Sequence, residues 1–117
     1  MNESERFWQH IDRLVAGAEV IIDRPAGTAH PRYPDFIYPL DYGYLQGTSA
    51  GDGGGIDVWR GSLPGAVASG GICTVDLTKH DSEIKILLGC TAGEMQVALR
   101  THNGGSMAGV LIERGRD

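Results

Sequence analysis

Two glycine-containing stretches near the middle of the chain carry the side chains best suited to chemistry. The first stretch, residues 38–44, is YPLDYGY, and the second, residues 51–59, is GDGGGIDVW. Asp52 and Asp57 lie on a glycine loop that runs into an apolar segment. Glycine lets a backbone approach a ligand closely, and carboxylates are oxygen ligands that suit Mg²⁺. The pattern therefore predicts a divalent metal site and phosphate chemistry, although Asp52 alone is equally typical of a turn.

The segment between residues 25 and 44 holds four of the five prolines and all four tyrosines of the chain. Proline fixes its own backbone angle, and tyrosine hydroxyls present polar groups at defined positions. The segment therefore predicts a rigid wall beside a polar ligand. The alternative is a loop that only covers one end of the fold.

Composition narrows the class of protein. A chain of 117 residues predicts a single domain over residues 1–117. The net charge of −5 and the lack of a basic cluster argue against a nucleic-acid partner. No apolar run approaches the roughly 18 residues of a membrane span, and the charged N-terminus lacks the apolar core of a secretory signal. We therefore expect a cytoplasmic protein without a membrane partner, whose Cys73 and Cys90 stay reduced.

Hydrophobic spacing predicts a mainly β, α+β fold. Phe7, Ile11 and Leu14 recur at helical spacing near the N-terminus, and Thr91 with Glu94 forms a capping box before a second, C-terminal helix. Five short strands between these helices suit a small barrel. The predicted helices cover residues 4–15 and 91–102, the strands cover 18–22, 42–48, 56–61, 71–77 and 83–89, and an extended segment covers 107–112.

The two stretches together resemble the soluble family I inorganic pyrophosphatases. In that family a Tyr-Pro-x-Asn-Tyr-Gly segment precedes an Asp-x-Asp-x-x-Asp metal signature that leads into a strand. The similarity extends from about Val20 to Leu88. It implies a five-stranded barrel of the OB type flanked by helices. It also implies a homo-oligomer, for which the apolar face of the first helix, with Trp8, offers a contact.

The resemblance further implies Mg²⁺-dependent hydrolysis of inorganic pyrophosphate to two phosphates by direct attack of a metal-activated water. The implied metal ligands are Asp52, Asp57, Asp81 and Glu83. The implied substrate-binding residues are Arg32, Tyr38, Tyr42 and Lys85. Arg32 stands where the family usually has a lysine, and Asp23 stands where it has a glutamate facing the cavity. The implied catalytic residues include Asp57, Lys85 and Arg32.

The sequence also departs from the family pattern. Gly54 takes the place of the middle aspartate, which in the family helps to hold and deprotonate the water, and Gly55 replaces a proline. An arginine-bearing segment before residue 38 and a tyrosine-lysine pair beyond residue 90 are also missing. Asp41 stands where the family has asparagine, so this carboxylate is a candidate replacement for the missing base. The alternative function is a catalytically impaired barrel that binds phosphate, a nucleotide or a protein partner.

Overall fold

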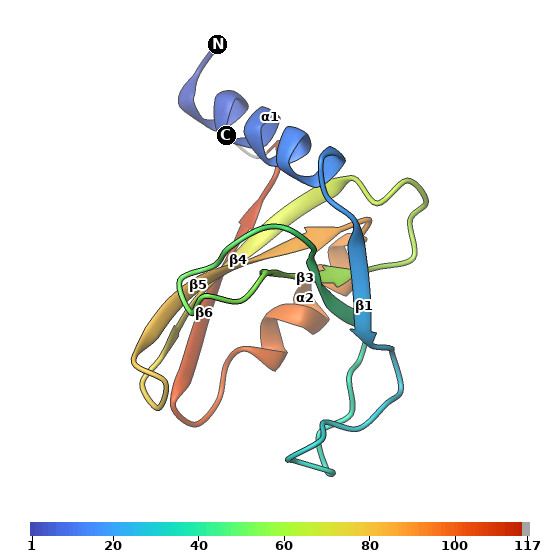
Figure 1. Ribbon diagram of the computed structural model, residues 1–117, viewed down its shortest axis with the longest axis vertical. Coiled ribbons are helices and arrows are strands. Elements are labelled where there is room, and N and C mark those ends of the chain that lie inside the picture. Colours follow the sequence, from blue (N-terminus) through green and yellow to red (C-terminus); the bar gives the residue numbers. More distant parts are fainter. Residues whose placement is uncertain (116–117) are drawn as a thin grey trace.

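The computed structural model describes residues 1–115, which form a mixed α+β fold of two helices and six strands (Figure 1). The α+β class predicted from the sequence is confirmed. The elements are, in chain order, α1 (Glu3–Ala16), β1 (Val20–Arg24), β2 (Asp41–Leu45), β3 (Ile56–Arg60), β4 (Ala68–Asp76), β5 (Asp81–Leu88), α2 (Ala92–Thr101) and β6 (Met107–Glu113).

The six strands form one sheet in the order β1-β2-β3-β5-β4-β6. Every neighbouring pair is antiparallel except β3 and β5, which run parallel. The extended segment expected at 107–112 is a full strand, β6, and it pairs along the outer edge of β4. Because β1 and β6 are the two ends of this order, the sheet of the described residues is open. A closed five-stranded barrel is not confirmed.

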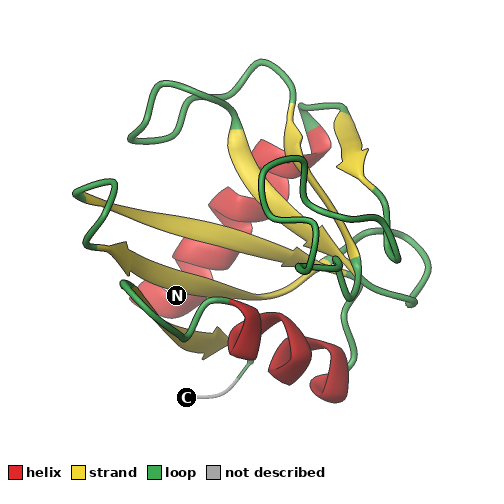
Figure 2. Cartoon of the chain, turned by 90° about the horizontal axis from the view of Figure 1, so that it is seen from below, coloured by secondary structure: helices red, strands yellow, loops and turns green. Residues whose placement is uncertain are grey.

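The helices cover opposite faces of the sheet (Figure 2). Trp8 and Ile11 of α1 pack with Val58 and Ile86 on one face. Met95 and Ala98 of α2 belong to the apolar cluster on the other face, which also contains Trp59, Ile72 and Leu87. Side chains alternate between the two faces along each strand, so neighbouring positions of β3 and β5 supply both cores. The face covered by α2 also carries the polar side chains described below.

The first helix buries a different stripe from the one predicted. Phe7 and Leu14 are 43% and 38% exposed, whereas Trp8 is only 5% exposed. The stripe is rotated by about one residue because the large indole ring of Trp8 takes the central position against the sheet. Trp8 is therefore packed within its own chain and is not available as a contact between copies. Asn2 is the N-cap of this helix, since its side chain accepts a hydrogen bond from the Glu5 amide at 2.8 Å.

The second helix begins and ends as its sequence indicates. Thr91 is the N-cap, and its side chain and that of Glu94 exchange hydrogen bonds with each other's backbone amides in a capping box. The Glu94 carboxylate also accepts from the Ser62 amide and hydroxyl, which fastens the helix start to the connection after β3. These contacts hold α2 over the middle of the sheet.

Both cysteines of the chain, Cys73 and Cys90, are free thiols. Burial, together with the nearby Glu94 charge, raises the pKa of the Cys90 thiol to about 12, so this group stays protonated and unreactive at neutral pH. Neither helix in residues 1–115 is long and apolar enough to cross a membrane.

Gly43 lies where strands β1 and β2 approach each other closely. A Cβ atom at this position would lie 1.8 Å from the Ile21 carbonyl oxygen on the neighbouring strand β1. The glycine of the YPLDYGY stretch is thus required by the β1–β2 pairing, which also brings the flanking tyrosines to one face. Its presence therefore has a structural reason that is independent of any ligand.

We expect Gly43→Ala to lower the free energy of unfolding by roughly 3 kcal/mol, because the added methyl group must push two paired strands apart. Chemical denaturation measures this loss. Gly93→Ala is the matched control, since nothing lies within 4 Å of the added atom in α2; it should instead stabilise the protein by about 0.5 kcal/mol. Equal effects of the two substitutions would contradict the proposed crowding at Gly43.

Candidate functional site

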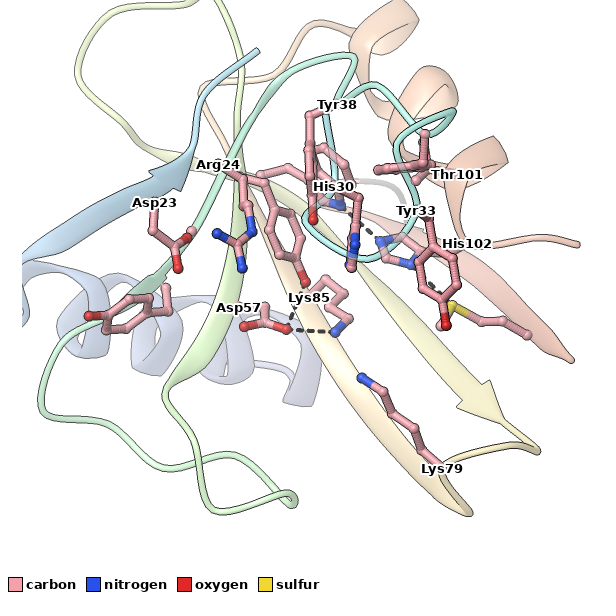
Figure 3. Close-up of a pocket in the computed structure, with 16 residues that line it drawn as sticks. Asp23, Arg24, His30, Tyr33, Tyr38, Asp57, Lys79, Lys85, Thr101 and His102 are labelled. Atoms are coloured by element: carbon pink, nitrogen blue, oxygen red, sulfur yellow. Dashed lines mark hydrogen bonds and ion pairs between the residues drawn. The ribbon is translucent and has the colours of Figure 1, made fainter. Parts of the chain in front are cut away.

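A pocket of about 490 Å³ opens on the α2 face of the sheet, beside the loop of residues 25–40 (Figure 3). Strands β1, β2, β3 and β5 contribute to its floor, and α2 and the loop contribute aromatic and polar side chains to its wall. The loop is ordered by its own backbone hydrogen bonds, including those from the His30 amide to the Phe36 carbonyl and from the Tyr38 amide to the Thr28 carbonyl. The proline- and tyrosine-rich segment therefore forms one wall of the pocket.

Lys85 lies at the centre of the site and is only 6% exposed. Its ammonium group contacts Asp57 Oδ2 at 2.7 Å and Glu83 Oε2 at 2.6 Å. Burial lowers the pKa of Lys85, but the hydrogen bonds and charges of Asp57 and Glu83 outweigh that effect, so its pKa lies above the ordinary value. Lys85 is therefore a fixed positive charge held between two carboxylates, and it does not face water as an ordinary strand lysine would.

Strand pairing explains why these groups meet. The parallel register pairs Val58 with Ile86, so that Asp57 and Lys85 lie side by side one residue earlier. Glu83 precedes Lys85 by two residues on β5 and therefore points to the same face. The meeting of the three charged side chains depends on the β3–β5 pairing, which joins segments nearly thirty residues apart.

Tyr42 adds a hydroxyl donor to the cluster. Its Oη donates to Asp57 Oδ2 at 2.7 Å, the same oxygen that receives the Lys85 ammonium group. Burial, and then the Asp57 charge, raises the pKa of Tyr42, so it remains a neutral donor. The second carboxylate oxygen of Asp57, Oδ1, has no hydrogen-bond partner among the described residues and remains available to a ligand.

Asp52 lies next to this cluster, on the glycine loop between β2 and β3. The Gly54 amide donates to Asp52 Oδ1 at 2.9 Å. This bond, with the nearby charge of Lys85, lowers the pKa of Asp52. Gly55, in contrast, fills a packing role, because a Cβ atom there would lie 2.8 Å from the Tyr44 ring.

The site contains carboxylates whose chemistry suits a divalent cation, but these carboxylates are not already arranged to bind one. Asp52, Asp57 and Glu83 supply hard carboxylate oxygens. With Lys85, these three acids leave two negative charges in excess. However, no three acidic, histidine or cysteine side chains among residues 1–115 are already arranged to hold a metal ion. A cation would be held by the same three carboxylates only after the flexible glycine loop carrying Asp52 had adjusted.

Five of the residues implied by the resemblance are not among those that line the pocket. They are Asp52 and Glu83, described above, and Arg32, Asp41 and Asp81. Asp41 accepts from the Ala26 amide at 2.9 Å and pairs with Arg60 at 3.1 Å, and these two contacts lower the pKa of its carboxyl group. Arg32 lies on the loop, where its amide donates to His30 Nδ1. Asp81 begins β5 opposite the end of β4. Asp41 therefore fastens the loop to β3 and is not positioned as a base.

Two cations of the pocket were missed by sequence reasoning. Arg24 follows a β-bulge at Asp23, where the register of the β1–β2 pair shifts, and such bulges redirect side chains near functional sites. Lys79 lies in the turn between β4 and β5, whose amides are held by the Asp76 carboxylate. Both side chains line the pocket, and neither forms an ion pair within residues 1–115. In the sequence Arg24 stands between the end of the predicted strand 18–22 and Pro25, and nothing local marks it as a pocket residue.

His102 and Trp59 close the inner end of the pocket. Trp59 Nε1 donates to His102 Nε2 at 2.9 Å, which leaves the proton of the neutral imidazole on Nδ1, 3.3 Å from Met107 Sδ. Burial, and then the charge of Lys85, lowers the pKa of His102 to about 4. These contacts give His102 a packing role.

Comparison of the chain with known protein families, with curated proteins and with solved structures gave no match in any of the three. The site described above therefore rests on the residues of this chain and their geometry. The similarity to family I inorganic pyrophosphatases remains a resemblance of motifs.

The buried imidazole of His102 predicts a specific pH dependence of stability. Between pH 6.5 and 4 the unfolded chain binds a proton at His102 that the folded chain does not, so stability falls as the pH is lowered through this window. We expect His102→Gln, which keeps an acceptor for Trp59, to gain roughly 2 kcal/mol relative to wild type between pH 7 and pH 4.5. Urea denaturation at each pH measures this gain, and parallel pH profiles for the two proteins would contradict it.

Proposed function

We propose that this protein binds pyrophosphate, or a compound that contains a diphosphate group, in the pocket and hydrolyses it with Mg²⁺. One observation carries the proposal, namely the meeting of Asp57, Glu83 and Lys85 beneath an open pocket, with Asp52 on the adjoining glycine loop. Carboxylates with an excess of negative charge suit a divalent cation, and cationic side chains without ion-pair partners suit a phosphate anion.

Different residues of the site would bind the cation and the phosphate anion. Asp52, Asp57 and Glu83 would hold Mg²⁺, which supplies positive charge to the substrate and lowers the pKa of water. Arg24 and Lys79 face the pocket without ion pairs and would bind phosphate oxygens. Tyr42, which keeps its proton, would fix the orientation of Asp57 during the reaction.

A second candidate function is phosphate binding without hydrolysis. Two observations favour it: Lys85 already neutralises part of the charge on Asp57 and Glu83, and Gly54 provides no carboxylate where the resemblance implies one. In this case the same cations would hold the ligand, and no base would activate a water. The two candidates differ in whether phosphate is released.

We expect the purified chain to release phosphate from pyrophosphate when Mg²⁺ is present and not when it is chelated. Asp52→Asn keeps the oxygen that accepts from the Gly54 amide and removes only the charge. It should therefore lower the rate about tenfold or more without unfolding the protein, since removing a metal ligand costs about that much. A colorimetric phosphate assay at high protein concentration makes the measurement, with denaturation as the folding check.

Two further variants make this assay decisive. An aspartate side chain fits at Gly54, because its Cβ would lie 3.4 Å from Asp52 Oδ1, an ordinary contact. Gly54→Asp should raise the rate of a weak hydrolase and leave a pure binding protein inactive. Asp41→Asn should reduce stability but not the rate, since the Asp41 carboxylate contacts the Ala26 amide and Arg60 and not the cluster around Lys85. No phosphate release from wild type and Gly54→Asp would exclude hydrolysis of pyrophosphate.

The strand order supports a finer description of the fold. We propose that the series β1-β2-β3-β5-β4, with β3 and β5 parallel, derives from a five-stranded OB-type barrel open between β1 and β4. The sixth strand, β6, pairs with the edge of β4 that would otherwise face β1. This order agrees with the OB-type barrel that the resemblance implies, and we place the protein in the cytoplasm, as the sequence suggests.

Self-association also remains part of the proposal. Strand β6 presents Val110 and Ile112, which are 63% and 42% exposed, and its outer edge pairs with no strand within residues 1–115. Unprotected apolar edge strands readily pair with a second chain. We expect light scattering after size exclusion to give a mass above the 12.5 kDa of one chain at micromolar concentration, and Val110→Lys to restore the monomer. A monomeric wild type would contradict this expectation.

A further inference from the structure

The pocket has two chemically different halves (Figure 3). One half contains the charged side chains of Arg24, Asp57, Lys79 and Lys85. The other half contains His30 and Tyr33 of the loop, together with His102 and Thr101 at the end of α2. Hydrolysis of a diphosphate group uses only the charged half, so the aromatic half needs a separate explanation.

The size of the pocket also indicates a ligand larger than pyrophosphate. Its volume of about 490 Å³ lies in the range of pockets that enclose organic ligands rather than small inorganic ions. A pyrophosphate ion held by the cations would leave the aromatic half filled only with water. A ligand that carries a planar group in addition to its phosphates would fill both halves.

Tyr33 is the clearest sign of a stacking surface. Its side chain is 65% exposed, although it lines the pocket, and its ring centroid lies 5.0 Å from that of His30. Its hydroxyl has no hydrogen-bond partner within residues 1–115. Tyr38 and Trp59, in contrast, are buried in the core. Tyr33 thus contributes little to the fold and presents a free aromatic surface at the rim.

His30 adds a directional donor beside this surface. Its Nδ1 accepts a hydrogen bond from the Arg32 amide at 3.0 Å, so the proton of the neutral imidazole lies on Nε2. The ring is nearly parallel to that of Tyr38, with an interplanar angle of 12°. Loop hydrogen bonds and ring contacts therefore hold His30 in place, and its free N–H group is available to a polar edge of a ligand.

We propose that the natural ligand of this pocket is a nucleoside diphosphate, whose base lies against His30 and Tyr33 and whose phosphates contact Arg24, Lys79 and Lys85. This inference rests on the proposed function, because it assumes that the charged half binds a diphosphate group. It adds the substrate class. An aromatic face accepts any nucleobase by stacking, so the geometry selects a nucleotide without selecting its base.

The test compares two ligands that resist hydrolysis and differ only in the nucleoside. These are α,β-methylene-ADP and methylenediphosphonate, both titrated calorimetrically in the presence of Mg²⁺. We expect wild type to bind the nucleotide analogue at least tenfold more tightly than the diphosphonate. Tyr33→Ala should weaken nucleotide binding roughly tenfold, the order of one lost base-stacking contact, and should leave diphosphonate binding unchanged.

Tyr33→Phe is the matched control, because it keeps the ring and removes the hydroxyl group; it should bind both ligands as wild type does. Equal affinities for the two ligands, or equal weakening of both by Tyr33→Ala, would overturn the nucleotide assignment and leave the proposed diphosphate site intact. Failure of wild type to bind either ligand would overturn both proposals. The exposure of Tyr33 makes unfolding of its variants an improbable cause of lost binding, and thermal denaturation checks this directly.

Discussion

The site depends on one buried charge, the ammonium group of Lys85, held between Asp57 and Glu83. A buried ion pair gains little over an apolar core, but removing one partner leaves an uncompensated charge and costs roughly 3–5 kcal/mol. The three groups must therefore be kept or lost together. Because Tyr42 donates to the same Asp57 oxygen as Lys85, the orientation of the carboxylate is fixed, and its other oxygen is left for a ligand. A pair that adds little stability thus gives the pocket a defined geometry.

The parallel pairing of β3 and β5 makes this cluster possible, and glycines allow the surrounding chain to fit. Gly43 lets β1 lie close against β2, and Gly55 makes room for the Tyr44 ring. These two positions belong to the stretches that also carry Tyr42, Asp52 and Asp57. The motif therefore combines packing constraints with chemistry, and its glycines alone do not reveal a ligand. Only the charged side chains that converge on the pocket distinguish the two explanations.

Local signals predicted the secondary structure well, because capping residues and proline act within a few positions of where they stand. Thr91 and Glu94 located the second helix in this way. The buried face of α1 and the open sheet were harder to predict. Trp8 packs against strands that are distant in the sequence, and the free edge of β4 pairs with β6. In the site, Asp57, Lys85 and Tyr42 were anticipated together. Arg24 and Lys79 were not, because a bulge and a turn direct them to the pocket and neither leaves a periodic pattern. Asp41 was expected near the reacting groups, but it pairs directly with Arg60 on the neighbouring strand β3, and the sequence does not display this pairing.

Charge balance shows why ligand and cation should bind together. Asp23, Asp52, Asp57 and Glu83 carry four negative charges and Arg24, Lys79 and Lys85 carry three positive charges, so the pocket and the cluster beside it keep one negative charge in excess. An entering diphosphate group adds several negative charges to a partly buried pocket, where Coulomb energies are larger than in water. A divalent cation at the carboxylates removes most of that repulsion, and by linkage the bound diphosphate must strengthen cation binding by the same factor. The absence of a preset metal geometry is therefore compatible with a metal-dependent site, because the phosphate oxygens would complete a coordination shell that the protein side chains supply only in part.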